Sequence, residues 1–425
     1  MPAGCFALAG GFRGSRCRVW ICMNKNKIVN DPVWGFIQLP SELAYDIVSH
    51  PYFQRLRRIV QMGLSFLVYP GAVHTRFNHS LGCMHLMKEA LDTLQAKGVR
   101  ISSEEKDAAC AAILLHDIGH GPLSHVLEHT LLPSVSHETV SRLIMRRLNR
   151  EWGGRLDMAM AIFNGTYDKP FLHQLVSGQL DVDRLDYLNR DSFYTGVQEG
   201  VVGTERIIKM MNVHEGQLVV EEKSIYSLEK FILSRRMMFW QVYLHKTSVC
   251  AELMLGHALD RARFLLMENR EVAGSPALLQ LLRRPSGREA DETLLAPFSE
   301  TDDSDIWMTL KVWTKSPDVV LRILSQSLLS RRLFKSELRN VPFEADYVDR
   351  KKAETLGKIE DAALLPYFFY EKGLSTKTYK YDTKEDDGIR VWRKDGQVVD
   401  LTTVSELLDR HFVMKADEKH LLCCL

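Results

Sequence analysis

The feature that most constrains the fold is an apolar helical segment that ends in a polar run broken by glycine. Residues 108–115, AACAAILL, are small or apolar throughout, which is typical of a helix buried on all sides. His116 and Asp117 come directly after it, and the next residues, IGHGP, favour a break. The sequence therefore predicts a buried helix that delivers an imidazole and a carboxylate at its C-terminal end.

Helical periodicity dominates residues 41–270, so the expected fold class is mainly α. Ser102 or Ser103, followed by acidic residues, predicts the start of the apolar helix. Residues 227–266 are long enough for one core helix with a bend. Strand character is confined to short segments, which predicts small antiparallel hairpins in a C-terminal α+β region, one of them turning at Asp395-Gly396.

Composition shifts predict four parts of the chain. Residues 1–22 are small, cysteine-rich and basic, unlike the rest of the chain, and are interpreted as a disordered leader or an over-extended start before Met23. Residues 23–270 form the helical domain. Residues 271–305, rich in Gly, Pro, Ser and charge, are expected to be a mobile connection, and residues 306–425 the C-terminal α+β region.

Charge and cysteine usage limit the classes of partner. The chain has 55 basic and 54 acidic residues, so no net field attracts nucleic acid or an anionic membrane. Eight cysteines without a C-x-x-C pair predict reduced thiols and a cytoplasmic protein. No stretch of 18 or more apolar residues occurs, so no transmembrane helix is expected.

Four side chains are candidate ligands of one divalent ion. His116 and Asp117 can be joined by His79, in TRFNHSLG, and by Asp183, in LDVDRLDYLNRD. Two imidazoles and two carboxylates suit Mn, Mg, Fe, Ni or Zn, whereas a thiolate-based site is not indicated. Any one of the four, taken alone, could equally be a hydrogen-bonded core residue.

The neighbouring histidines and cations suggest chemistry on a phosphate. His125, three residues before Glu128, is the best candidate for a proton-transfer pair, and His120 and His137 could also transfer protons or grip phosphate. Phosphate needs cations, for which the candidates include Arg76, Arg184 and Arg235, although helical arginines are often merely solvated. Tyr187, Asp191 and Tyr243 could cradle a sugar or base. Because no nucleotide-cofactor loop is present, metal-assisted hydrolysis is the favoured chemistry.

The order of these motifs resembles that of the HD-domain phosphohydrolases, and within them the deoxynucleoside triphosphate triphosphohydrolases. It runs from NDPVWGFIQLP through FQRLRRIVQMG, HTRFNHSLG, LLHDIGHGPLSH and LDVDRLDYLNRD to VYLHK, about half the chain. The resemblance implies an HD-domain helical core and hydrolysis of dNTPs to deoxynucleoside and triphosphate, with attack at the α-phosphorus.

The resemblance also implies roles residue by residue. It places His79, His116, Asp117 and Asp183 on the metal, His125 and Glu128 as the catalytic pair, and His120 and His137 on the phosphates, together with Arg76, Arg184 and Arg235. Gln61, Tyr187, Asp191 and Tyr243 fall where the family reads the deoxyribose. Arg184 replaces a frequent lysine.

Regulation and substrate stay open at this point. The resemblance suggests a homodimer or homotetramer and a guanine-nucleotide activator, for which Lys27, Asn30 and Arg57 are in place, but Ser49-His50 stand where activated relatives carry an acid. Two alternatives remain: hydrolysis of another phosphoester, such as a nucleoside monophosphate or cyclic nucleotide, and a nucleotide-sensing module with little activity. Near-zero net charge argues against a broad nucleic-acid surface.

Overall fold

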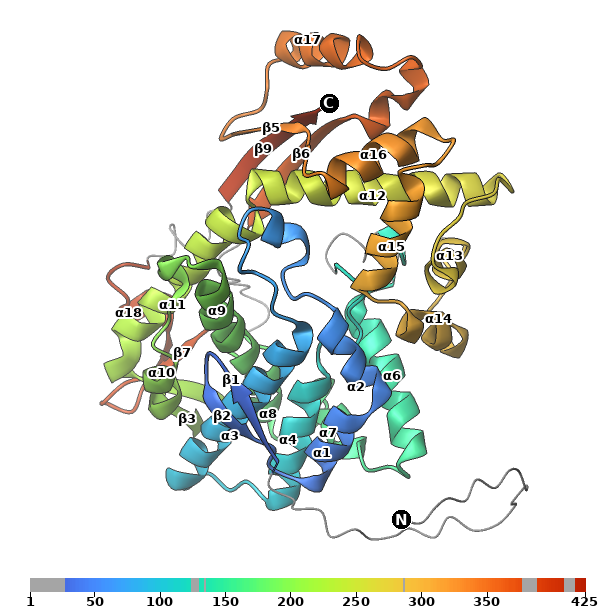
Figure 1. Cartoon of the computed structure of the whole chain (residues 1–425). Helices are drawn as coiled ribbons and strands as arrows, with labels where there is room; N and C mark the ends of the chain where they lie inside the picture. The colour runs from blue at the N-terminus through green and yellow to red at the C-terminus, as the bar shows by residue number, and fades with distance from the viewer. Residues whose placement is uncertain (1–26, 124–129, 134, 286, 377–387, 409–416) are drawn as a thin grey trace, which may run out of the picture.

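The computed structural model describes residues 27–123, 130–133, 135–285, 287–376, 388–408 and 417–425. The fold class is mainly α, as expected, with an HD-type helical core and small sheets (Figure 1). The leader expected at 1–22 lies outside the described residues.

The first part of the chain forms a helical core behind a two-stranded antiparallel sheet. Its elements are β1 (Ile28–Asp31), β2 (Gly35–Gln38), α1 (Glu42–Ser49), α2 (Pro51–Gln54), α3 (Arg76–Ala96), α4 (Ser103–Leu115), α6 (His137–Glu151), α7 (Asp157–Phe163), α8 (Pro170–Val176), α9 (Val182–Thr195) and α10 (Thr204–Met210). α4 is buried along most of its length, because its small alanine side chains let α1, α3 and α7 approach it closely.

The expected long helix at 227–266 is interrupted rather than only bent. α11 (Ile225–Met238) runs into a π-helical turn at Phe239–Tyr243, and α12 (Lys246–Met267) starts anew after it. His245 caps α12, since its Nδ1 accepts a hydrogen bond from the Thr247 amide. Single π turns often mark functional positions, and this one carries Tyr243.

The remaining described helices follow α12 in the sequence. They are α13 (Pro276–Leu282), α14 (Leu295–Glu300), α15 (Asp303–Trp313), α16 (Val319–Leu329), α17 (Ala345–Leu356) and α18 (Leu401–Val404). The range 271–305, expected as a mobile connection, thus holds α13 and α14. Leu278, Leu282 and Phe298 are buried there, because their apolar side chains find the core.

Two further sheets use strands from the C-terminal region. β5 (Lys335–Arg339) and β6 (Phe369–Thr376) flank β9 (Asp417–Cys424) in one antiparallel sheet, beside α12 and α17. β7 (Arg390–Trp392) and β8 (Val398–Asp400) form the predicted Asp395-Gly396 hairpin, with Gly396 at φ +86°.

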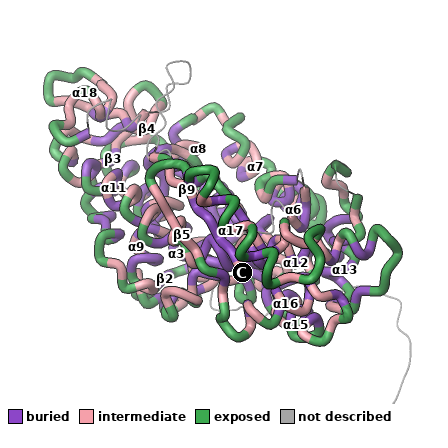
Figure 2. Tube along the Cα trace, turned by 90° about the horizontal axis from the view of Figure 1, so that it is seen from above, coloured by how far each residue is buried: buried purple, intermediate pink, exposed green. Residues whose placement is uncertain are grey.

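That hairpin joins strands from the first part of the chain. β3 (Met211–His214) pairs with β4 (Gln217–Glu221), and β7 then pairs in parallel with β4. The expected division into domains is therefore crossed by a sheet. Figure 2 shows buried residues along the middle of the molecule and exposed ones around its rim, so the two regions share one interior.

Candidate functional site

Three helices bring the expected ligands together. α3 carries Arg76 and His79 in its first turn, fixed by a capping box between Thr75 and Asn78. α4 starts at the Ser102 cap predicted from the sequence and delivers His116 and Asp117 at its end. α9 begins at its own cap, Asp181, so Asp183 lies in the first turn. Each ligand therefore stands at a helix end.

Gly119 lets the loop after α4 pack against the start of α6. A side chain at Gly119 would collide with the His137 carbonyl and with the Ser141 amide. The Gly119 amide donates to Ser141 Oγ at 3.0 Å, and that hydroxyl donates to the His116 carbonyl at 2.9 Å. The glycine thus permits a close approach that seats His116 and His137 on one side of the site.

The four candidate ligands converge on one point. His79 Nε2 lies 3.0 Å from Asp183 Oδ1 and 3.7 Å from Asp117 Oδ2. His116 Nε2 lies 3.3 Å from Asp117 Oδ1 and 3.6 Å from Asp183 Oδ1. Donor atoms that each sit about 2.0–2.2 Å from a shared ion are separated by roughly such distances. His116 Nε2 is buried and makes no hydrogen bond to a described residue. Donor atoms of His79, His116 and Asp183 lie close enough together to hold one divalent ion, and Asp117, which also groups with His120 and His137, adjoins them.

The opposite nitrogen of each imidazole is held by the protein. His79 Nδ1 is 2.8 Å from Asp186 Oδ2, and His116 Nδ1 is 2.6 Å from the Ile113 carbonyl. Asp186 is itself held by the buried Arg190, whose guanidinium also reaches Asp31 at 2.7 Å. Such partners fix the tautomer that turns Nε2 to an ion.

Asp31, Asp186 and Arg190 were not predicted as functional residues from the sequence. A signal was available, because Asp186 and Arg190 are four residues apart on the helix that carries Asp183. Their position in LDVDRLDYLNRD makes one face of α9 a row of charges, which a buried helix tolerates only when they are paired.

Cys83 also adjoins the centre, one turn after His79. Its Sγ lies 3.6 Å from His79 Nε2, and it groups spatially with His79, His116 and Asp183. Burial raises the pKa of the Cys83 thiol well above its usual range. It is therefore a neutral thiol packed against the imidazole, in line with the expected nitrogen and oxygen ligands.

Electrostatics keep the carboxylates charged. Burial raises the pKa of Asp117, but His116, His120 and Arg76 outweigh it and hold that pKa well below its usual range. For His79, burial lowers the pKa, but the hydrogen bonds to Asp183 and Asp186 outweigh it and raise that pKa well above its usual value. The site thus collects negative oxygens that require cations, and a metal ion would replace protons on the imidazoles.

A second group of side chains shares Asp117. His120 Nε2 lies 3.3 Å from Asp117 Oδ1, Arg76 pairs with Asp117 Oδ2, and the His120 and His137 rings stack at 4.0 Å. Burial, aided by Arg76, lowers the pKa of His120 to about 3, so its imidazole is neutral. The His120 and His137 rings and the Arg76 guanidinium together form a surface that could bind phosphate oxygens.

The expected sugar-binding residues form a third group around Asp191. Tyr243 donates to Asp191 Oδ2 at 2.8 Å, and His74 Nε2 is 2.8 Å from Asp191 Oδ1. The Tyr187 and Tyr243 rings meet edge to face at 6.1 Å. Gln61 adjoins this group, since its backbone amide donates a hydrogen bond to the His74 carbonyl.

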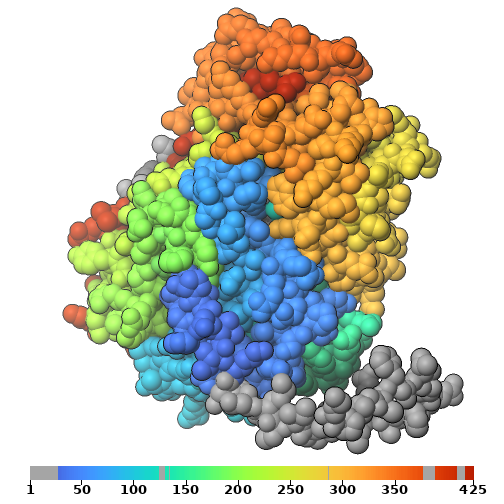
Figure 3. Space-filling view, viewed as in Figure 1, coloured from blue at the N-terminus to red at the C-terminus, as the bar shows by residue number. Residues whose placement is uncertain are grey.

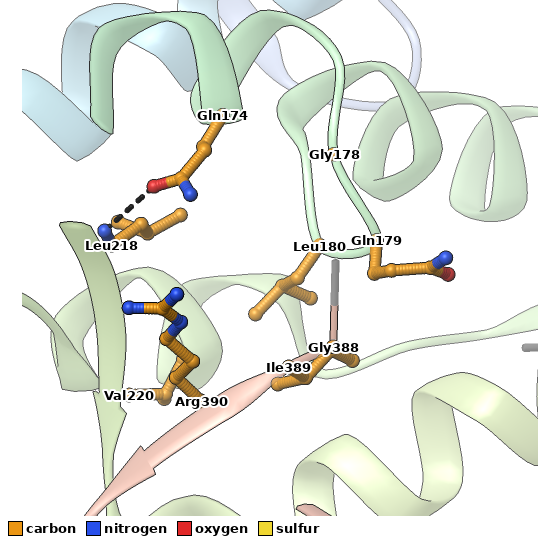
Figure 4. A pocket seen from close by; sticks show the side chains of 9 residues that line it. All are labelled: Gln174, Gly178, Gln179, Leu180, Leu218, Val220, Gly388, Ile389 and Arg390. Carbon is orange, nitrogen blue, oxygen red and sulfur yellow. Dashed lines mark hydrogen bonds between the residues drawn. The ribbon is translucent and has the colours of Figure 1, made fainter. Parts of the chain in front are cut away.

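The cations expected at the phosphates take different places. Arg235 is close enough to Tyr187 and Tyr243 to oppose the effect of burial on their pKa values, which are raised. Arg184 is held by Asp181 and by Gln179, 3.2 Å from its Nη1. Gln179 borders a cleft with about 390 Å³ of open space between the start of α9, β4 and β7 (Figure 4).

The expected proton-transfer pair, His125 and Glu128, lies outside the described residues. Within the described part of the chain, no helix is long and apolar enough to cross a membrane.

Comparisons with known proteins identify the family of this chain. Family models for the HD domain and for an HD-associated region match residues 76–191 and 202–272. The Bacillus subtilis protein YwfO is 30% identical over 406 residues, which are 91% of this chain and 89% of that protein. A phosphohydrolase of known structure from Bacteroides thetaiotaomicron is 47% identical, with a TM-score of 0.89, and the match covers 94% of this chain and all of that one.

A relative whose name states an activity matches a shorter part. Human deoxynucleoside triphosphate triphosphohydrolase SAMHD1 is 29% identical over 288 residues, which are 57% of this chain and 46% of that protein. The match therefore spans about half of each protein.

Proposed function

The chain belongs to the HD-domain phosphohydrolases, and from that premise we propose that it is a metal-dependent hydrolase of dNTPs that releases deoxynucleoside and triphosphate. The proposal draws on the partial similarity to SAMHD1-type proteins and on one observation in particular. Asp183, Tyr187 and Asp191 recur every four residues on α9, so a metal ligand, an aromatic ring and a carboxylate share one helix face.

That spacing suits a nucleotide lying along α9. Successive turns are about 5.4 Å apart, so the face extends from the ion-binding end to the Asp191 group over two turns. The phosphate would lie at Asp183 and the sugar beside Tyr187 and Tyr243. Asp191 accepts a hydrogen bond from the Tyr243 hydroxyl. We therefore assign Asp191 two roles: it positions that hydroxyl, and it binds the sugar.

His79, His116, Asp117 and Asp183 would hold the metal. When bound, the ion acidifies a water molecule and neutralises phosphate charge. Arg76, His120 and His137 would bind phosphate oxygens, with Arg184 and Arg235 placed further along the substrate. Metal identity is not specified by this mixed donor set.

The leaving group defines the need for an acid. Attack of water at the α-phosphorus forms one phosphorus–oxygen bond and breaks the bond to the sugar 5′-oxygen, which must gain a proton. We assign that proton to His125, with Glu128 holding its imidazole. This pair stays a prediction from the sequence.

Product analysis tests the proposal. The protein is incubated with Mn²⁺ and each dNTP, and the products are separated by HPLC. Release of deoxynucleoside and triphosphate is expected. Orthophosphate released from a nucleoside monophosphate, with dNTPs untouched, would instead assign a different phosphoester. No turnover of either class would leave a nucleotide-sensing role.

The same reactions test activation and assembly. We propose a homo-oligomer whose activity responds to a guanine nucleotide near Lys27, Asn30 and Arg57. Arg57 now stacks on Phe77, 3.5 Å from the ring centre, so an activator would compete with that contact. Addition of GTP or dGTP should raise turnover and change the sedimentation coefficient, and an unchanged rate would reject the activator.

A further inference from the structure

A single buried carboxylate, Asp303 at the start of α15, joins two segments that border the site. Its Oδ2 accepts a hydrogen bond from the Val60 amide at 2.8 Å, and its Oδ1 accepts one from the Leu123 amide at 3.0 Å. Asp303 is only 6% exposed. It lies beyond the two matched family regions, which end at residue 272.

The Val60 segment leads directly to the start of α3. Val60 forms a bridge with Thr75, the Arg76 amide donates to the Ile59 carbonyl at 2.9 Å, and the Gln61 amide donates to the His74 carbonyl at 2.9 Å. A displacement of Val60 would therefore move the helix end that carries Arg76. It would also move His74, which holds Asp191.

Leu123 lies in the segment after α4 that also carries Asp117 and His120. Leu123 has φ +48°, a left-handed conformation that a leucine adopts only when its surroundings impose it. The Asp303 carboxylate supplies one such constraint. It fixes the amide of the residue that is held in the unfavourable conformation.

Arg55 ties the same segments together a second time. Its Nη1 donates to the His120 carbonyl and its Nε to the Thr301 carbonyl, both at 2.9 Å, and its guanidinium lies over Phe298. Figure 3 shows the orange segment of α15 lying against the blue N-terminal segment. Phe298, Thr301 and Asp303 thus form a brace against the loop.

We propose that Asp303 is a positioning residue of the hydrolytic site, which keeps the α3 start with Arg76 in register with the loop that carries Asp117 and His120. Two amide donors on separate segments require two acceptor oxygens, which a carboxylate offers. An asparagine offers one oxygen and turns an NH₂ group against the other amide. Burial raises the pKa of Asp303 to about 6. An ionised carboxylate at this position therefore costs desolvation free energy, which a side chain that only fills space would not cost.

The test compares Asp303→Asn with Asp302→Asn in the full chain. Asp302 is the preceding residue and pairs with the half-exposed Arg58, and an asparagine there can still cap α15. Hydrogen exchange is measured at peptides covering 59–62 and 118–123, together with metal content and dNTP kinetics.

We expect Asp303→Asn to retain metal, to accelerate exchange of the Val60 or Leu123 amide by about tenfold or more, and to lower kcat by about 10-fold to 100-fold with a smaller change in KM. Asp302→Asn should resemble wild type in all three. Matching exchange in the two variants, or faster exchange with unchanged kcat, would overturn the proposal.

The kinetic part rests on the proposed function, but the exchange part does not. If wild type hydrolyses no dNTP, the proposed function fails, and unchanged exchange at Val60 and Leu123 still rejects the brace. Thermal melting checks whether Asp303→Asn still unfolds cooperatively. If it does not, Asp303→Glu and Asp303→Ala are compared instead. The Leu123 amide should be better protected from exchange in Asp303→Glu, which keeps both carboxylate oxygens, than in Asp303→Ala.

Discussion

At the residue scale, Asp183 contacts both imidazoles of the candidate metal site. It approaches both imidazoles, His79 at 3.0 Å and His116 at 3.6 Å, through one oxygen. Its 30% side-chain exposure makes it the most exposed of the four candidate ligands.

Asp183→Ala should abolish metal retention and lower hydrolysis by at least about 100-fold, because one of the two carboxylates that balance the ion is lost. Metal is measured by elemental analysis after gel filtration. Glu205→Ala, on the exposed face of α10, is the matched acidic control and should keep both properties. Unchanged hydrolysis in Asp183→Ala would argue against metal-dependent catalysis at this centre.

Asp186→Asn tests the partner behind His79. The amide can keep one hydrogen bond to Arg190 or His79, but it cannot serve both as the carboxylate does. Metal affinity should fall by about 10-fold to 100-fold, as for other partners of metal-binding histidines. Titration of the metal-free protein measures this, and an unchanged affinity would show that His79 is oriented by packing alone.

The candidate metal ligands could be predicted from the sequence, because histidine and aspartate bind metal ions and stand here in recognisable motifs. The structure brings these four residues close together, namely His79, His116, Asp117 and Asp183. Asp31, Asp186 and Arg190 were missed, because a buried ion pair looks the same in sequence as a solvated one. The pairing of Asp31 with Arg190 can be seen only in the folded structure, where β1 lies beside α9.

At the scale of the element, α4 depends on both of its ends. Ser102 and Glu105 form the capping box at its start, and Glu105 also binds Lys169 and Tyr167. The loop at its other end depends on Gly119. The candidate ligands His116 and Asp117 are therefore positioned by contacts that lie a full helix length apart.

Glu105→Gln should reduce the acid sensitivity of folding. Burial raises the pKa of Glu105, but Lys169, the Ser102 amide and Tyr167 outweigh it, so the pKa is lowered. Its stabilising effect is complete above the unfolded pKa of about 4.5 and is lost as pH falls through the folded value. Thermal midpoints should differ between wild type and variant at pH 7 and converge below about pH 4. A constant difference would contradict the assignment.

Gly119→Ala should disable the site while Gly203→Ala does not. The new methyl group at Gly119 meets backbone of α6, which cannot swing away, whereas Gly203 has open space around it and a negative φ. We expect Gly119→Ala to cost about 1–3 kcal/mol and most of the activity. Chemical denaturation and turnover measure both. Equal behaviour of the two variants would show that the loop adapts.

Element type could be predicted from periodicity, but the break inside residues 227–266 could not. The pattern at 227–266 predicts a bent helix, yet the π turn and the His245 cap divide it. The turn is fixed by tertiary contacts, among them Tyr243 with Asp191 and Trp240 with Asp417. Such contacts leave no periodic trace in the chain.

At the scale of the whole molecule, the C-terminal region shares one folded core with the helices that carry the candidate site. β7 extends the sheet that β3 and β4 begin, and Asp417 on β9 binds Arg236 of α11 at 2.6 Å. The Asp395-Gly396 turn predicts the β7–β8 hairpin. The partner strand could not be predicted, since strand pairing between distant segments depends on the assembled fold.

Leu421→Ala should destabilise the entire protein rather than one end of it. Leu421 is fully buried on β9, so its truncation should cost about 2–5 kcal/mol, with a single unfolding transition. Leu407→Ala, at a side chain that is 60% exposed, is the control and should change stability by less than about 0.5 kcal/mol. A separate early transition in Leu421→Ala would show that the C-terminal sheet unfolds alone.

The order β5-β9-β6 places the last strand of the chain in the middle of its sheet. During synthesis, β5 and β6 leave the ribosome with no partner between them, and their edges must wait for residues 417–425. Emergence of residues 417–424, not emergence of the helical core, is thus the event that lets this sheet close. A nascent chain that stalls before residue 417 would expose two unpaired strands to chaperones or to neighbouring copies.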